Sequence, residues 1–417
     1  IENWDMSQSF RYKLLHGPSA SFEGLIRKDP INKKEIKLAA LSCNSNKDRG
    51  DRENYVNNIN ALDPDLVFFA GDQSYDHKEH TAAWLKFGLQ FRDVFRTRPA
   101  ITIPDDHDIG QGNLWGENGK KSLRPDGNDG GYFFHTEYVK MVERAQTSHL
   151  PDPFHKEPLE QGITSYFTNL VIGGIDFAII EDRKFKSGPN GKIPQQGPRA
   201  DHILNPDYNP DDINLPELKL LGDLQLNFLN QWAQNKDQNR MKAVLSATGF
   251  CGGAHLHGKQ NNRLHADLDS NGWPQQGRDK ALELIKKAGA IHIAGDQHLP
   301  TLIKHGITEF DDGPWAFVVP AIVNDYYSRW WWPEDEKPGK NANDLLPWTG
   351  QYLDGFNNKI TMHAYANPDS DSNGSGFGLI RFDTTSNEVT FECWPRNIDV
   401  TNKDAKQFLG WPLKVKY

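Results

Sequence analysis

Four short apolar segments of this chain are each followed at once by residue types that bind metal ions. The four junctions are Ile36–Ser42 before Cys43, Leu66–Ala70 before Gly71-Asp72-Gln73-Ser74-Tyr75, Ala100–Ile103 before Pro104-Asp105-Asp106-His107-Asp108, and Ile291–Ala294 before Gly295-Asp296-Gln297-His298. In the sheets of α/β proteins, side chains that follow the carboxyl ends of different strands converge on one crevice. The pattern therefore predicts a metal centre built at the ends of several strands.

The other apolar segments alternate with helical patterns along the chain. Further predicted strands are Ile175–Ile180, Ala243–Ser246, Ala316–Val319, Gly378–Phe382 and Val389–Cys393. Predicted helices are Asp51–Asn60, Thr81–Arg96, Tyr132–Ala145, Leu224–Gln234 and Arg278–Lys287. This alternation is typical of an α/β fold, or of a sandwich that helices cover.

The composition argues against two broad classes of protein. The chain has 47 Lys and Arg residues against 56 Asp and Glu residues, so its formal net charge is −9. A nucleic-acid-binding protein usually presents a basic surface, so we expect no stable nucleic-acid partner. No segment approaches the roughly 18 consecutive apolar residues that a membrane-spanning helix requires, so we expect no membrane span.

The first residue bears on the compartment, whereas the cysteines do not decide it. Cys43, Cys251 and Cys393 are an odd number and too few for a disulfide framework. The chain begins with Ile1 instead of Met, which indicates a processed or trimmed product whose targeting segment, if any, is missing. We therefore expect a secreted or periplasmic protein.

The residue types at the four junctions suit a centre with two unlike cations. A carboxylate can bridge two cations, whereas Cys, Tyr and His suit a softer or borderline cation and further carboxylates suit a hard one. Each junction also has an ordinary explanation. A Gly-Asp pair is common in turns, a lone Cys often packs in a core, and an Asp-Asp-His-Asp segment can cap a helix. Their joint occurrence, in this order, favours the metal centre.

The same motifs resemble those of the PhoD-like alkaline phosphatase/phosphodiesterase family, within the calcineurin-like metallophosphoesterases. In chain order they are Ser42-Cys43, Gly71-Asp72-Gln73-Ser74-Tyr75, Asp105-Asp106-His107-Asp108, Glu181-Asp182-Arg183-Lys184-Phe185, Leu221-Gly222-Asp223-Leu224-Gln225 and Gly295-Asp296-Gln297-His298. The similarity extends from about Ile36 to about Asn324. The chain departs from the family patterns at Gln297 and over 249–259, which leaves the substrate preference open.

The resemblance implies a four-layer α/β/β/α sandwich with two mixed sheets. It divides the chain into a short N-terminal extension, 1–35, without the N-terminal β-domain of long family members, and a metallophosphoesterase catalytic domain, 36–417. Loop insertions are expected near 110–131 and 186–216, and their polar, glycine-rich composition predicts exposed loops.

The resemblance also implies the metal ligands. In chain order, the implied ligands are Cys43, Asp72, Tyr75, Asp106, Asp296 and His298. Cys43, Tyr75 and His298 correspond to ligands of an Fe(III) ion, and Asp72 corresponds to the carboxylate that bridges both metals. Asp106 and Asp296 correspond to ligands of a divalent cation. The family suggests calcium for this second site, with zinc, manganese or magnesium as alternatives.

Two further residues are implied to act on the substrate. His107 corresponds to a histidine that contacts the phosphate and protonates the leaving oxygen. Asp106 and Asp108, on either side of it, are expected to favour its cationic form. Arg183 is expected to bond to a phosphate oxygen, although an ion pair with Asp182 or a neighbouring loop is an equally common role for such an Arg.

We therefore expect an enzyme that hydrolyses phosphate esters, most of all phosphodiesters and also monoesters, by a metal-activated hydroxide at a two-metal centre. One alternative is a catalytically degenerate protein of the same fold that binds polysaccharide through its tryptophans. Another is a hydrolase of a non-phosphate bond, since function resides in the site and not in the fold. The sequence leaves the natural alcohol group and the oligomeric state open.

Three groups of residues keep open interpretations. Cys251, His255 and His257 follow the strand at Ala243–Ser246; a ligand of the second metal, a separate zinc site or no metal role all fit. The segment Tyr326–Trp332 is either a buried aromatic cluster or a wall that faces the substrate. The remaining histidines considered, His16, His77, His135 and His149, are interpreted as ordinary structural or surface residues.

Overall fold

The structure is a computed structural model, which describes residues 5–235, 240–258, 262–324, 328–333, 345–369 and 372–417 of the 417-residue chain. The helices within these ranges are α1 (Glu53–Leu62), α2 (His80–Gln90), α3 (Arg92–Phe95), α4 (Asp106–Ile109), α5 (Thr136–Thr147), α6 (Gly222–Gln234) and α7 (Gln275–Ala288), with short 3₁₀ helices η1 (Glu117–Gly119), η2 (Glu160–Gly162) and η3 (Pro210–Ile213). None of the described helices has the length and apolar content to cross a membrane.

The largest sheet has eight strands and mixes parallel with antiparallel neighbours. In spatial order these are β18 (Gly350–Leu353), β19 (Lys359–Tyr365), β14 (Thr301–His305), β15 (Trp315–Val318), β13 (Ile291–Gly295), β9 (Lys242–Thr248), β7 (Ile175–Ile179) and β6 (Thr168–Ile172). The central strands β15, β13, β9 and β7 are parallel, and the flanking pairs are antiparallel.

A second sheet of seven strands is also mixed. Its order is β22 (Leu413–Lys416), β21 (Glu388–Pro395), β20 (Gly376–Asp383), β3 (Glu35–Asn44), β4 (Leu66–Phe69) and β5 (Ala100–Thr102), with β16 (Ala321–Val323) beside the end of β3. The strands β3, β4, β5 and β16 are parallel, whereas β20 to β22 are antiparallel to their neighbours. The predicted α/β class and the two mixed sheets are confirmed.

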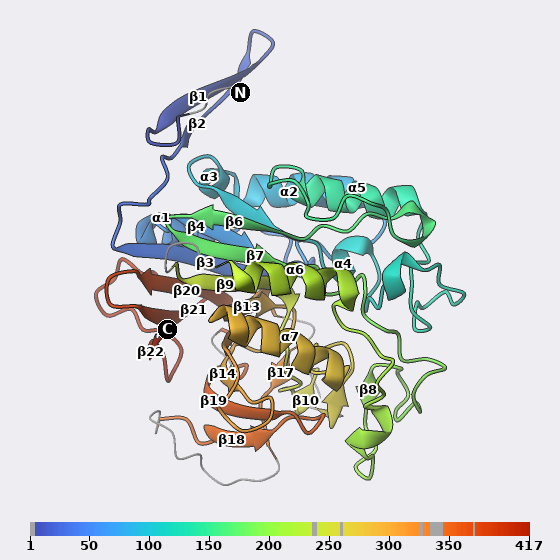
Figure 1. Cartoon of the computed structure of the whole chain (residues 1–417). Helices are drawn as coiled ribbons and strands as arrows, with labels where there is room; N and C mark the ends of the chain where they lie inside the picture. Colours follow the sequence, from blue (N-terminus) through green and yellow to red (C-terminus); the bar gives the residue numbers. More distant parts are fainter. Residues whose placement is uncertain (1–4, 236–239, 259–261, 325–327, 334–344, 370–371) are drawn as a thin grey trace.

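Three smaller sheets lie outside these two. They are β1 (Phe10–His16) with β2 (Ala20–Ile26), β8 (His202–Ile203) with β12 (Ala266–Asp267), and β11 (Asn262–Arg263) with β10 (Leu256–His257) and β17 (Arg329–Trp330). In Figure 1 the β1–β2 hairpin projects from the body of the molecule, while β8, β10 and β17 lie at its opposite side.

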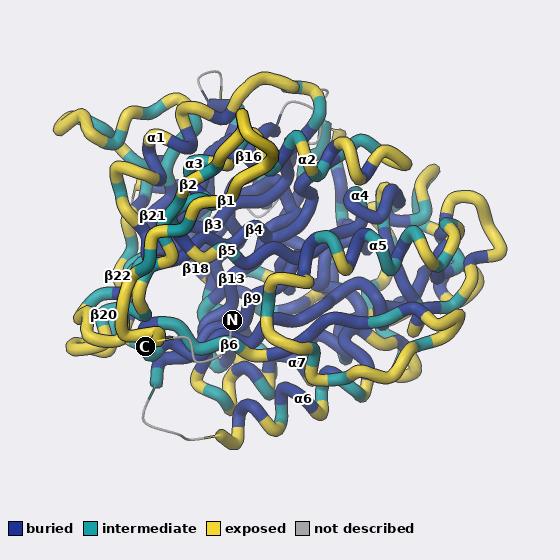
Figure 2. Tube along the Cα trace, turned by 90° about the horizontal axis from the view of Figure 1, so that it is seen from above, coloured by how far each residue is buried: buried dark blue, intermediate teal, exposed yellow. Residues whose placement is uncertain are grey.

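Strand β3 is buried on both faces, which explains its continuous apolar sequence. Leu38 belongs to the core cluster that contains Phe177 of β7 and Ile293 of β13, so this face of β3 meets the eight-stranded sheet. Ala39, one position along, belongs to a cluster with residues of α1, α2 and α3. A further cluster joins α6 and α7 to the eight-stranded sheet. Figure 2 shows the central strands buried and the β1–β2 hairpin exposed.

All nine predicted strands are present, but one predicted helix is interrupted. The segment Thr81–Arg96 forms α2 and α3, because Phe91 between them has φ −112° and ψ 11° and leaves the α-helical conformation. The break keeps Phe91 packed against Phe69 of β4, at 5.0 Å between ring centroids.

The β1–β2 hairpin was not predicted. Most of its residues are exposed, so its sequence lacks the apolar run of the other strands.

The two long loops differ from the exposed loops that their composition predicts. Both lack long regular elements, and 186–216 contains only the two-residue β8 and η3. Parts of each are buried, including Gln111, Trp115, Lys186 and His202. Apolar residues of both loops, Trp115, Ile193, Ile203 and Ile213, pack into one hydrophobic cluster, and some buried polar groups are paired inside the protein. Lys186, for example, donates hydrogen bonds to two backbone carbonyls, which offset the desolvation of its ammonium group.

Candidate metal centre

Four of the predicted ligands have an unusual backbone conformation. Cys43, Asp72, Asp296 and His298 have φ values of 56°, 57°, 65° and 52°. L-residues rarely adopt this left-handed region, which costs on the order of 1 to 3 kcal/mol per residue and is concentrated at functional sites. Each residue lies at or just after the carboxyl end of β3, β4 or β13. The strained backbone turns these side chains into one space.

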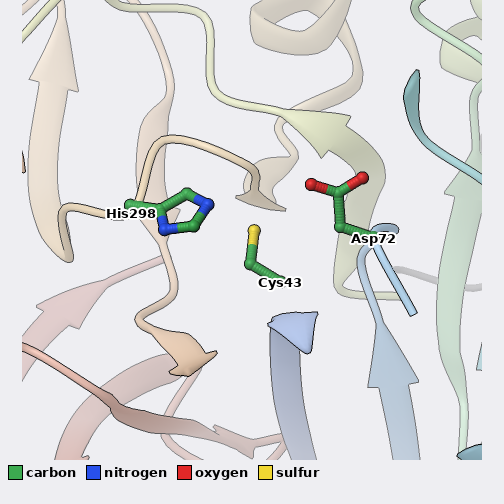
Figure 3. Close-up of side chains that lie close together, drawn as sticks. All are labelled: Cys43, Asp72 and His298. Carbon is green, nitrogen blue, oxygen red and sulfur yellow. The ribbon is translucent and has the colours of Figure 1, made fainter. Parts of the chain in front are cut away.

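Cys43, Asp72 and His298 form the first group of candidate ligands. One ligand atom from each lies within 4.8 Å of the others. In Figure 3 the sulfur of Cys43 points between the carboxylate of Asp72 and the ring of His298. Tyr75 adds a phenol to this group, because its Oη lies 2.7 Å from Asp72 Oδ2 and 3.0 Å from His298 Nε2. The group therefore offers sulfur, nitrogen, phenol and carboxylate donors to one ion.

A second group consists only of carboxylates. Asp72, Asp105, Asp106 and Asp296 each place one oxygen within 4.8 Å of the others, and all four residues are buried. Asp72 belongs to both groups, so its carboxylate lies between the mixed donor set and the oxygen donor set. Hard cations favour oxygen ligands of this kind.

Because both groups of side chains are buried, ionising them costs free energy. Burial, followed by repulsion from Asp105 and Asp108, raises the pKa of Asp72 well above its usual value. Burial likewise raises the pKa of the Cys43 thiol and the Tyr75 phenol, with Asp72 adding to both shifts. Cations among these atoms would offset the desolvation and the repulsion. The donor set therefore fits two metal ions.

Asn324 orients the imidazole of His298. Its side-chain oxygen lies 2.9 Å from His298 Nδ1, and its amide nitrogen donates to the backbone oxygen of His298 at 3.2 Å. An amide oxygen accepts, so Nδ1 carries the proton and Nε2 is the nitrogen on the side of Tyr75. Burial lowers the pKa of His298 to about 3, which keeps the ring neutral and able to bind a metal.

His107 is half-buried at the start of α4, and its ring lies 4.1 Å from the ring of Tyr75. Its Nδ1 bonds to Nε2 of His77 at 2.7 Å. The expectation of a cationic His107 is wrong, since burial, followed by His77 and His298, lowers its pKa well below the usual value. The carboxylate of Asp108 instead accepts from the backbone N–H groups of Asp72 and Asp105, at 2.8 and 3.0 Å. His77, interpreted from sequence as an ordinary residue, is part of the site.

Arg183 lies behind the carboxylates, away from the surface that a substrate can reach. Its side chain is fully buried and forms ion pairs with Asp105 at 2.6 Å, Asp269 at 2.6 Å and Asp296 at 3.2 Å. Burial alone would lower the pKa of Arg183, but these carboxylates raise it. The predicted bond to a phosphate oxygen disagrees with this placement. The alternative was an ion pair with Asp182 or a neighbouring loop, and the pairs with acids of other loops agree with its second form. Arg183 instead holds Asp105 and Asp296 in position.

Cys251, His255 and His257 have different surroundings in the structure. Cys251 belongs to the main core cluster, and His255 Nδ1 accepts from the backbone N–H of Trp332 at 3.1 Å. Among the described residues, no metal-like group of His, Cys and acidic side chains includes any of the three. His257 alone reaches the cavity described below.

A cavity of about 420 Å³ opens onto the centre. It is lined by Asp72, Asp106, His107, Asp296 and His298 together with polar residues of the two long loops, including Asn113, Arg124, Asn190 and Arg199. None of the lining residues is Trp, Phe or Tyr. Of the segment Tyr326–Trp332, Arg329 lines the cavity, while 326–327 lie outside the described residues. The aromatic wall is therefore not found among the described residues, and Arg329 was missed because the tryptophans beside it dominate the sequence pattern.

Comparisons with known proteins find solved structures with a similar architecture. A solved structure of PhoD matches with a TM-score of 0.62, over 98% of this chain and 76% of PhoD, at 13% sequence identity. The chain has the fold of PhoD. The resemblance inferred from the motifs is thus confirmed at the level of the fold. A dimetal phosphatase from Danio rerio covers 92% of this chain and 99% of its own, at 8% identity and a TM-score of 0.44. No family model and no curated protein matches the sequence.

Proposed function

We propose that this protein hydrolyses phosphate esters at a centre of two metal ions. The observation that carries the proposal is the position of Asp72, whose carboxylate belongs both to the group of Cys43 and His298 and to the carboxylate group. One residue shared by a mixed donor set and an oxygen donor set suits a bridge between unlike cations. The PhoD-like fold supports this reading.

The donor atoms suggest which ion takes each place. We assign Cys43, Tyr75 and His298 to Fe(III), because thiolate, phenolate and imidazole suit a transition metal. Asp106 and Asp296 are assigned to a divalent cation, with calcium favoured by their hard oxygen donors and zinc, manganese or magnesium as alternatives. When bound, the two cations would lower the pKa of a water molecule and neutralise charge on the phosphoryl oxygens.

His107 is the residue of this chain best placed to act on the leaving group. It lines the cavity beside Asp72 and Asp106. Because Nδ1 bonds with His77, we assign the contact with the leaving oxygen to Nε2. A low pKa favours a neutral ring before the substrate binds, and charge that develops on the phosphate would then favour its protonated form.

The layers of the fold support the same proposal. The two large sheets share the main core cluster, while α1 to α3 and α6 with α7 cover their outer faces. This arrangement agrees with the four-layer α/β/β/α sandwich expected from the motifs. It brings the ends of β3, β4, β5 and β13 to one region between the sheets.

The alternative of a degenerate polysaccharide-binding protein is weaker, because the candidate ligands are all present and no Trp, Phe or Tyr of the described residues lines the cavity. We favour diesters over monoesters only on the resemblance of the motifs.

The deciding experiment combines metal analysis of the purified protein with assays on matched mono- and diesters, before and after chelation. Hydrolysis that is lost on chelation and restored by metals would support the proposal. Full activity with a single zinc ion would contradict the two-metal assignment.

A further inference from the structure

Three arginines line the cavity that opens onto the metal centre. They are Arg124 from the loop 110–131, Arg199 from the loop 186–216, and Arg329 from β17. None of them lies in the motifs that predicted the centre. Their presence in one cavity, beside Asp72, Asp106 and His107, raises the question of what they bind.

Arg329 is held in place by a buried carboxylate. Its Nη2 donates to Asp267 Oδ2 at 2.9 Å, and Asp267 is only 1% exposed. The backbone is fixed as well, since Arg329 of β17 lies opposite His257 of β10 in antiparallel register. A guanidinium held by one carboxylate on a paired backbone is pre-organised to bind a ligand, because less conformational entropy remains to be lost.

Arg329 also has a donor that the protein does not satisfy. The residue is 8% exposed, and its Nε has no hydrogen-bond partner among the described residues. A buried N–H without an acceptor costs on the order of 1 to 3 kcal/mol. An acceptor oxygen supplied by a ligand would remove this cost. Because Arg329 lines the cavity, such a ligand would lie beside the candidate metal ligands.

Arg199 repeats this arrangement at a more exposed position. Its Nε and Nη2 donate to the two oxygens of Asp201, at 3.0 and 2.7 Å, and Asp201 is buried. No described residue accepts from its Nη1. The guanidinium groups of Arg199 and Arg329 are therefore each anchored at one side by aspartate, with further donors available to the cavity.

We propose that Arg329, assisted by Arg199, binds an anionic oxygen of the substrate, a phosphate or a carboxylate oxygen. This inference rests on the proposed function, because Asp72, Asp106 and Asp296 also line the cavity and would repel an anion unless cations neutralise them. Arginine suits this task, since its planar group forms directional, charge-assisted hydrogen bonds to phosphate and carboxylate. The anionic oxygen belongs either to the phosphate that is cleaved or to a second acidic group on the alcohol.

The test uses the metal-loaded protein and the variants Arg329→Gln and Arg329→Lys. Arg329→Gln should keep its metal content and lower kcat/KM by about 10- to 100-fold, the scale of one charge-assisted hydrogen bond. Inhibition by inorganic phosphate should weaken by a similar factor, and Arg329→Lys should recover part of both. The matched control is Arg98→Gln, which removes a buried arginine that pairs with Asp63 outside the cavity.

Two substrates distinguish the sources of the oxygen. The first substrate is an activated ester with a neutral alcohol, and the second is a diester with a carboxylate on its alcohol. If kcat/KM falls equally on both, Arg329 binds the cleaved phosphate. A loss confined to the second substrate places it on the acidic alcohol. Unchanged kinetics and unchanged phosphate inhibition in Arg329→Gln would overturn the inference. If that variant does not fold, Arg199→Gln at the more exposed position should show a smaller loss of the same kind, and no loss there would also overturn it.

Failure of the proposed function can be told apart from failure of this inference. If the wild-type protein hydrolyses no phosphate ester, the binding of inorganic phosphate to the metal-loaded protein still reports on Arg329 by calorimetry. If phosphate binding weakens in Arg329→Gln and not in Arg98→Gln, the anion-binding role of Arg329 is supported even though the proposed hydrolytic function is wrong.

Discussion

His77 Nε2 and His107 Nδ1 lie 2.7 Å apart. This bond orients the ring of His107, which lines the cavity and has a nitrogen within 4.8 Å of carboxylate oxygens of Asp72 and Asp106. His77 comes from the exposed segment after β4, whereas His107 belongs to α4. The ring of His107 is further held by Tyr75 at 4.1 Å between centroids. His77 and Tyr75 are thus two of the neighbours that orient the His107 ring.

We expect His107→Ala to lower kcat by roughly 10²- to 10⁴-fold, the usual scale for a positioned proton donor. His77→Ala should have a smaller effect, about 10-fold, because it loosens the ring and leaves it in place. Steady-state kinetics and metal analysis of both variants would check this. Both should keep their metals, and loss of both metals in His107→Ala would reassign that residue as a ligand.

The shared position of Asp72 predicts a different outcome for its removal. Asp72→Asn should deplete both metals, because one carboxylate contributes to both donor groups. Metal content measured on the purified variant, with His107→Ala as the control, would test this. A variant that loses one metal and retains the other in full would show that Asp72 is not a bridge.

Tyr75 predicts a spectroscopic signal. A phenolate bound to Fe(III) gives a ligand-to-metal charge-transfer band in the visible range, so the iron-loaded protein should be coloured. Tyr75→Phe should lose this band because it removes the oxygen that lies 2.7 Å from Asp72. Tyr132→Phe is the matched control, since Tyr132 is a buried tyrosine of a separate core cluster. A band that survives in Tyr75→Phe would remove Tyr75 from the ligand set.

The sequence predicts the strand ends well and the supporting contacts poorly. Cys43, Asp72 and His298 are adjacent to apolar strands, so a local pattern marks them. Asn324 supports His298 only because β16 pairs with β3, and no local pattern indicates that contact. Arg183 and Asp105 lie still further apart in the chain, 78 residues, so no local pattern indicates the buried ion pair between them.

The charge of His107 illustrates a second limit. The sequence shows Asp106 and Asp108 beside it, and their proximity alone favours a cation. The structure turns the carboxylate of Asp108 towards backbone N–H groups, and burial of the ring, followed by His77 and His298, lowers the pKa of His107. The burial of a ring and the direction in which a carboxylate points depend on packing between distant segments. Neither can be inferred from the residues next to them in the chain.

The tryptophans of β17 and its continuation predict a stability difference. Trp331 is fully buried, and its Nε1 donates to the backbone oxygen of Trp348 at 2.9 Å, whereas Trp332 is 44% exposed. Trp331→Ala should lower the free energy of unfolding by about 3 to 5 kcal/mol, the usual cost of truncating a buried Trp. Trp332→Ala should cost much less. Denaturant unfolding of both variants checks this, and equal losses would contradict the difference in burial.

Asp182 predicts the pH dependence of stability. Its Oδ2 accepts from the backbone N–H of Thr248 at 2.9 Å and from Asn271 Nδ2 at 2.7 Å, while Oδ1 is buried with no hydrogen-bond partner among the described residues. Burial, followed by the charge of Asp105, raises the pKa of Asp182 from 3.8 to about 6. The folded protein therefore holds this proton more tightly than the unfolded chain does.

Stability should accordingly fall as the pH rises from about 4 to 6, because the folded state must then release the proton. At about 1.4 kcal/mol per pKa unit, the loss is about 3 kcal/mol above pH 6. Asp182→Asn keeps an acceptor for Thr248 and Asn271 and removes the charge. It should therefore be more stable than the wild type at pH 8 by about 1 to 3 kcal/mol, and should lose this advantage at pH 4.

Unfolding midpoints at pH 4 and pH 8 measure this difference, and Asp312→Asn provides a control of opposite sign. Partial burial alone would raise the pKa of Asp312, but N–H bonds from Ile307 and Thr308 outweigh it and lower that pKa. Ionised Asp312 thus stabilises the fold at pH 8, and its replacement should cost stability there. An Asp182→Asn variant that is less stable than the wild type at pH 8 and equal to it at pH 4 would mean that the buried carboxylate is stabilised by charge, against the direction of its pKa shift.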